Sequence, residues 1–208
     1  LFFIIIYRAI AETFQFQEHE RNPHQAWLVA LGDRRLMIYG AVNILMTTYF
    51  AQLQSTMPLY FKNFVSGGGV SPTTISILFS WHIAFAAFWQ LPVARFLNRF
   101  SHLRALIFSL LLWGIGFIFV WVTGAIQNHA LIWAIVARGV PAIAMVAYTP
   151  AASALVVDFA PPSLRGVYLA INSQCWAIGY LIGPPIGGWA LDRSPTFAHS
   201  FWLAAATS

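Results

Sequence analysis

The sequence predicts an all-α, polytopic transmembrane helix bundle. Hydrophobic residues make up 59% of the chain and charged residues 8%, whereas a soluble domain carries roughly 25% charged residues because its surface faces water. The few charges are gathered between long apolar runs, and a helix needs about 20 such residues to cross a bilayer. The uncharged runs cover residues 36–61, 63–94, 105–137, 139–157 and 166–191.

The predicted elements follow these runs in order. Residues 1–11 are apolar and would be the end of one membrane helix, and residues 12–35 form a polar hinge or loop that could include a short surface helix. Complete spans within 36–192 are expected at about 36–59, 73–97, 106–123, 130–157 and 166–191. Residues 197–208 would begin a truncated helix, so we expect the chain to be a fragment of a longer protein.

Turn-forming residues separate the predicted spans. Residues 66–72 read SGGGVSP, in which flexible glycines precede a proline whose fixed φ suits the first turn of a helix. Residues 124–129 form a tight turn, and residues 158–165 form another that contains Pro161 and Pro162.

The basic residues are concentrated on one side of the predicted spans. That side holds Arg8, Arg21, Arg34, Arg35, Arg95, Arg99, Arg104 and Arg165, whereas Lys62 and Arg193 lie on the other. The positive-inside rule therefore places loops 12–35, 95–104 and 158–165 in the cytoplasm, for a protein of the plasma membrane. Because the charges do not form a patch, membrane lipid is the expected partner, and no nucleic acid is expected.

Polar side chains inside the spans mark a candidate cavity. Such residues usually face a bundle interior or a water-filled cavity. One interpretation is hydrogen bonding that holds the helices together, and the other is a lining that binds an amphipathic or cationic solute. The candidates for the lining are Thr48, Tyr49, Gln52, His82, Arg138, Asn172 and Trp176.

Arg138 is the one arginine or lysine deep inside a predicted span, because Arg95 lies at the very end of its span. It lies roughly 13 Å deep at 1.5 Å per residue, where an arginine either snorkels, forms an ion pair or serves a substrate or gating role. The predicted spans contain no Asp or Glu. A proton-coupling carboxylate would therefore lie outside them.

A stripe of small residues marks the last complete span. Gly179, Gly183 and Gly187 recur every four residues and share one helix face, which lets membrane helices approach closely. Pro184 and Pro185 each remove a helix hydrogen bond and favour a kink. The stripe is either a packing surface alone or a bend point in a moving, gating helix.

These segments resemble the major facilitator superfamily. The run DFAPPSLRGVYLAINSQCWAIGYLIGPPIGGWALD is similar to the link between that family's tenth and eleventh helices and to the eleventh helix itself, and DRRLMIYGAVNILMTTYFAQLQSTMPLYF is similar to its seventh. Asn98, Arg99 and Arg104 stand in a loop similar to the family's G-x-L-x-D-R-x-G-R motif. The glycine-proline segment is similar to the antiporter motif, with Ala170 at its first glycine.

The resemblance implies the C-terminal six-helix half of a transporter, from the end of the sixth helix (1–11) through the cytoplasmic central loop (12–35) to the start of the twelfth (197–208). It implies secondary transport by alternating access, with the N-terminal half of the same transporter as partner. The drug–proton antiporter branch fits best, which implies proton-coupled efflux of drug-like or amphipathic compounds. A carrier for a sugar or another metabolite is the alternative, and a membrane-embedded protein without transport activity is a minor one.

No enzyme motif occurs in the sequence. H-E-x-x-H, G-x-S-x-G, a Walker loop and clustered Cys or His are all absent. We therefore expect no catalytic residue, no metal and no cofactor.

Overall fold

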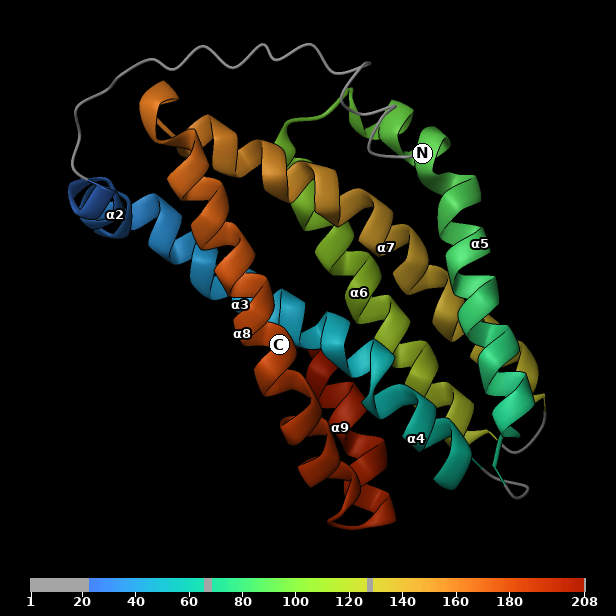
Figure 1. Cartoon of the computed structure of the whole chain (residues 1–208). Helices are drawn as coiled ribbons and strands as arrows, with labels where there is room; N and C mark the ends of the chain where they lie inside the picture. Colours follow the sequence, from blue (N-terminus) through green and yellow to red (C-terminus); the bar gives the residue numbers. More distant parts are fainter. Residues whose placement is uncertain (1–22, 66–68, 127–128, 208) are drawn as a thin grey trace, which may run out of the picture.

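The computed structural model describes residues 23–65, 69–126 and 129–207 (Figure 1). The predicted helix end at residues 1–11 and residues 12–22 of the predicted loop lie outside these ranges. The described elements are α2 (Pro23–Gly32), α3 (Arg34–Gln54), α4 (Thr56–Asn63), α5 (Pro72–Leu97), α6 (His102–Ala125), α7 (Ala130–Phe159), a short 3₁₀ helix η1 (Pro162–Leu164), α8 (Arg165–Leu191) and α9 (Pro195–Thr207). No strand occurs in the described part of the chain, which confirms the all-α prediction.

Four helical segments are long and apolar enough to cross a membrane. They are Arg34–Asn63, which joins α3 and α4, together with α5, α6 and α7. Helix α8 has 27 residues, but its polar side chains, glycines and prolines lower its mean hydropathy, so it is not among these four. That α8 crosses the membrane stays a prediction. The observed helix bounds lie close to those of the predicted spans.

The first predicted span is broken where α3 gives way to α4. The backbone N–H of Ser55 bonds to the carbonyls of Ala51 and Gln52, which ends α3. Pro58 lies in the first turn of α4 and has no N–H to donate to the carbonyl of Gln54. A continuous helix is therefore interrupted inside the membrane-spanning segment.

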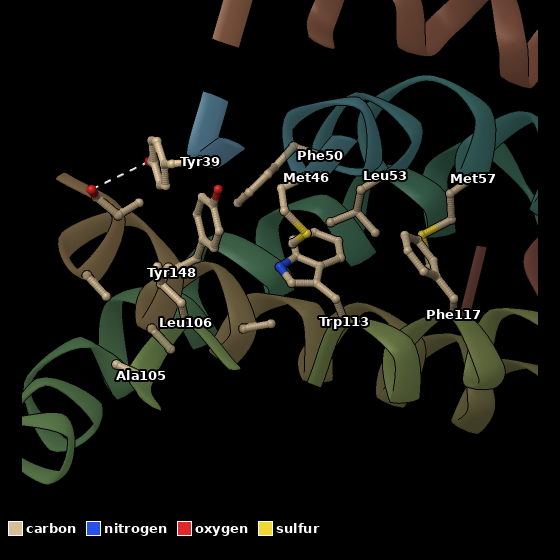
Figure 2. Packing of buried hydrophobic residues seen from close by; sticks show 14 of the residues in the cluster. Tyr39, Met46, Phe50, Leu53, Met57, Ala105, Leu106, Trp113, Phe117 and Tyr148 are labelled. Atoms are coloured by element: carbon tan, nitrogen blue, oxygen red, sulfur yellow. Dashed lines mark hydrogen bonds between the residues drawn. The ribbon is translucent and has the colours of Figure 1, made fainter. Parts of the chain in front are cut away.

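The helices pack in a defined set of pairs. Helix α6 packs against α7 and α9, α3 packs against α8, and α5 packs against α7 (Figure 1). Figure 2 shows side chains of α3 lying over Trp113 and Phe117 of α6. The rings of Phe50 and Trp113 meet edge to face with centroids 4.7 Å apart, an arrangement that aromatic pairs prefer. These contacts hold α3 between α6 and α8.

Candidate solute cavity

A cavity of about 660 Å³ lies where α5 and α7 meet the end of α3. Its volume falls within the roughly 300–1,000 Å³ of small-molecule sites. The lining residues are Gln54, His82, Ile83, Ala86, Ala87, Gln90, Ala94, Met145, Val146, Thr149, Pro150 and Ser153.

The lining comes from one face of each helix. On α5 the lining residues recur every three to four positions from His82 to Ala94, and on α7 they do so from Met145 to Ser153. Alanines at 86, 87 and 94 leave space that larger side chains would fill. The cavity therefore forms because small side chains lie on the faces of α5 and α7 that meet each other.

The cavity carries hydrogen-bonding groups but no carboxylate, lysine or arginine. Gln54, Gln90, Thr149 and Ser153 supply amides and hydroxyls, and no Asp, Glu, Lys or Arg is among the lining residues. Pro150 has no N–H, so the carbonyl of residue 146 lacks its usual helical donor. The lining therefore suits an apolar or amphipathic solute that accepts or donates a few hydrogen bonds.

His82 is the one predicted lining residue that the structure places on this cavity. Its side chain is 4% exposed, and its Nδ1 lies 2.8 Å from the carbonyl oxygen of Arg138. This contact ties α5 to α7 at the edge of the cavity.

Arg138 lies beside the cavity rather than on it. Its Nη1 donates to the carbonyl oxygen of Leu53 at 2.8 Å, and its guanidinium carbon lies 4.1 Å from the ring centroid of Phe79. Leu53 directly precedes Gln54, which lines the cavity. Arg138 therefore links α7 and α5 to the α3–α4 joint and positions that end of α3.

Gln52 and Thr48 lie in the α3–α8 contact. The amide of Gln52 donates from Nε2 to the carbonyl oxygen of Gly183 at 2.8 Å and accepts from the hydroxyl of Thr56. The hydroxyl of Thr48 donates to the carbonyl oxygen of Ile44 at 2.8 Å, within its own helix. Neither side chain is among the residues that line the cavity.

Asn172 belongs to a buried polar cluster that joins α3, α7 and α8. The hydroxyl of Tyr148 donates to Oδ1 of Asn43 at 2.6 Å, and Nδ2 of Asn43 donates to Oδ1 of Asn172 at 2.8 Å. Tyr39 also donates to Oδ1 of Asn172, at 2.9 Å. The cluster satisfies polar groups that lipid or an apolar core would leave unpaired.

Tyr49 and Trp176 are partly buried and take part in ring contacts. The ring of Tyr49 meets Phe117 edge to face at 5.2 Å between centroids, while Trp176 lies 5.0 Å from Phe50 and stacks on Tyr180 at 6.2 Å. These contacts join α3 to α6 and to α8, and they lie apart from the lining.

The glycine stripe of α8 packs directly on α3. A Cβ added at Gly179 would lie 2.7 Å from the backbone nitrogen of Thr48, and one added at Gly183 would collide with the Cβ of Ala51. At Gly187 it would collide with Thr56. Helix α8 continues through Pro184 and Pro185 as one helical segment. The stripe therefore acts as a close packing surface in this conformation, as small residues do between membrane helices.

The three predicted motif residues lie at the surface, Asn98 and Arg99 between α5 and α6 and Arg104 in the first turn of α6. Asn98 is the C-cap of α5, and Arg99 and Arg104 are exposed. Nearby, Nδ1 of His102 lies 2.8 Å from Oδ2 of Asp158, which joins the start of α6 to the end of α7.

Most lining residues were missed in the sequence, among them Gln54, Met145, Thr149 and Ser153. For those on α7, the sequence signal was the spacing of small and polar residues along the helix. Spacing identifies a helix face but does not tell which other helix packs against that face. In the described ranges no three His, Cys, Asp or Glu side chains gather into a possible metal site.

Comparison with known proteins gives one family match. No curated protein of similar sequence was found. The model of the Major Facilitator Superfamily matches residues 36–208, which include every helix that borders the cavity. The chain therefore belongs to the major facilitator superfamily.

Proposed function

We propose that this chain forms part of a proton-coupled exporter of amphipathic, drug-like compounds. Family membership makes the protein an integral membrane protein and a secondary transporter. The finer proposal rests above all on the cavity between α5 and α7, whose lining combines apolar side chains with neutral hydrogen-bonding groups. A lining without Asp, Glu, Lys or Arg favours solutes that are largely apolar over phosphates or dicarboxylates.

In this proposal, transport proceeds by alternating access. The cavity opens to one side of the membrane at a time, as two helix bundles rock about it. The second bundle would be the N-terminal half of the same transporter, packed on the exposed side of α5. That helix supports this role because only 17% of its most apolar window is buried. In this proposal residues 12–35, 95–104 and 158–165 lie in the cytoplasm of a plasma-membrane protein, and the basic residues of these segments support that orientation.

Proton coupling would involve His82 and a carboxylate beyond the lining. His82 is the one titratable side chain among the lining residues, and histidine changes charge near neutral pH. Because the lining contains no Asp or Glu, the carboxylate that carries the proton would belong to the second bundle.

A carrier for a sugar or another uncharged metabolite is the second candidate. The amides of Gln54 and Gln90 and the hydroxyls of Thr149 and Ser153 favour it, because they are the neutral groups that bind hydroxyl-rich solutes.

The test is efflux from cells that express the full-length protein. The cells are loaded with a fluorescent lipophilic cation, with and without a protonophore. The proposal expects extrusion that the protonophore abolishes. No extrusion, with the protein present in the membrane, contradicts the drug proposal, and uptake of labelled sugars then tests the second candidate.

Matched variants connect the efflux to the cavity. Gln90→Ala removes a lining amide, whereas Leu111→Ala changes a side chain on α6 that is 63% exposed and outside the lining. We expect Gln90→Ala to lower the efflux rate several-fold and Leu111→Ala to leave it unchanged. Equal efflux rates in the two variants would contradict a role of the cavity in transport.

A further inference from the structure

Helix α2 exposes an unusual amount of apolar surface. It contains ten residues from Pro23 to Gly32, none of them charged, and directly precedes the first candidate span. Its large apolar side chains are exposed by 39% at Trp27, 70% at Leu28, 48% at Val29 and 49% at Leu31. Apolar surface in water costs about 25 cal/mol per Å², so this helix needs an apolar environment.

The bundle itself does not provide that environment. Helix α2 contacts α3 and α8, and the side chains that it buries are the small ones, Ala26 and Ala30. Figure 1 shows α2 end-on beside the start of α3, so its axis runs across that of α3. A ten-residue helix is about 15 Å long, which is too short to cross a hydrocarbon core of about 30 Å and is a length found in interfacial segments.

The charges next to α2 complement an anionic surface. Arg34 and Arg35 follow the helix and are exposed, and Arg165 is exposed at the start of α8. Within the described residues none of these three guanidinium groups has a carboxylate within 4.0 Å. Basic residues at a membrane surface are attracted to anionic lipid headgroups, and tryptophan is enriched at the same depth.

We propose that α2 is an interfacial anchor that lies in the plane of the lipid surface. Trp27, Leu28 and Leu31 enter the boundary between headgroups and acyl chains, while Arg34 and Arg35 contact anionic headgroups. The helix then fixes the depth at which α3 enters the bilayer. This role concerns the lipid surface and stands apart from the solute cavity.

Spin labelling tests the depth of α2. The full-length protein carries Cys175→Ala, which removes the one cysteine of this chain, and any cysteine outside the chain is replaced likewise. One new cysteine is then introduced at Leu28, at Leu111 on the outer face of α6, or at Asn98 in an exposed loop. Each variant is labelled in vesicles of equal parts phosphatidylcholine and phosphatidylglycerol, and the access of oxygen and of a water-soluble nickel chelate is measured.

The proposal expects the label at Leu28 to be reached by oxygen and shielded from nickel, at a depth between those at Asn98 and Leu111. A label at Leu28 as open to nickel as the one at Asn98 would overturn it, because α2 would then face water. Shielding from both reagents would also overturn it, because protein would then cover the helix, either a second copy or another segment.

A second measurement keeps the native cysteine. Lipids brominated near the headgroup quench nearby tryptophans, and Trp27→Phe changes an exposed side chain without disturbing the core. We expect the quenched fraction of the emission to fall in Trp27→Phe. An unchanged fraction would contradict the proposal.

Discussion

Gly183 shows at the scale of one residue how α8 meets α3. A Cβ at this position would collide with the Cβ of Ala51 and lie 3.1 Å from the carbonyl oxygen of Thr48. Because a Cβ is fixed to the backbone, Ala51 has no rotamer that relieves the clash. At Gly188, on the same helix, an added Cβ would have no other atom within 4 Å.

We therefore expect Gly183→Ala to destabilise the protein by about 1–3 kcal/mol, the usual cost of overpacking. Gly188→Ala is the matched control and should be neutral or slightly stabilising, because alanine favours a helix over glycine. Thermal unfolding of both variants in detergent measures the difference. Equal melting temperatures would show that α8 does not pack on α3 as described.

Asn43 is a second informative residue, because it lies fully buried between two other polar side chains. Asn43→Ala leaves the hydroxyl of Tyr148 and the carbonyl of Asn172 without this partner, and an unpaired buried group costs about 1–3 kcal/mol. A double-mutant cycle of Asn43→Ala and Tyr148→Phe measures the coupling free energy between the two side chains. We expect the double variant to lose less stability than the two single variants together, and strict additivity would rule out the contact.

The residue scale also shows what the sequence could not predict. Thr48, Gln52 and Asn172 were recognised as polar positions inside spans, and helical spacing placed them on common faces. Spacing identifies a face but not its neighbour, and these faces meet another helix instead of the cavity. Whether any of them binds solute stays a prediction.

At the scale of elements, charge and hydropathy predicted the spans well. The helix bounds followed from charged junctions and from prolines such as Pro72, where α5 begins. The break at Ser55 was missed although Pro58 stands in the sequence, because apolar composition does not tell whether a proline kinks a helix or ends it. The short helix that the predicted loop at 12–35 could include is observed as α2, at Pro23–Gly32.

Asp33 joins three of these elements at one point. Its side chain accepts from the N–H of Arg35 at 2.9 Å, which caps α3, and from the hydroxyl of Tyr168 on α8 at 2.9 Å. Partial burial would raise the pKa of Asp33, but the hydrogen bonds from Tyr168, Arg35 and Leu36 and the charge of Arg35 lower that pKa below its usual value. The ionised carboxylate therefore stabilises the junction.

Because the folded-state pKa is lowered, this stability is present above the ordinary carboxyl pKa of about 3.9 and is lost as the pH falls through the folded value. We expect Tyr168→Phe to lower the melting temperature at pH 7, and this effect to fade only as the pH falls below about 3.9 and through the lowered folded-state pKa of Asp33. Tyr180→Phe is the control on the same helix, with a side chain 42% exposed. A difference between Tyr168→Phe and wild type that is independent of pH would refute the role of the Asp33 carboxylate.

At the scale of the whole molecule, our proposal makes the described helices one wall of a solute path. Helices α5 and α7 line the cavity, and α3 closes one end with Gln54. Arg138 and the α3–α8 contact hold α3 in place.

The most direct test of this account is the reactivity of single cysteines in the full-length protein, with Cys175 and any cysteine outside this chain replaced. Gln90→Cys and Ser153→Cys would lie on the cavity, and Leu111→Cys would face lipid. We expect a water-soluble thiol reagent to modify the first two rapidly, and a transported compound to slow that reaction. If Gln90→Cys and Ser153→Cys react as slowly as Leu111→Cys, the space between α5 and α7 is not an aqueous solute path.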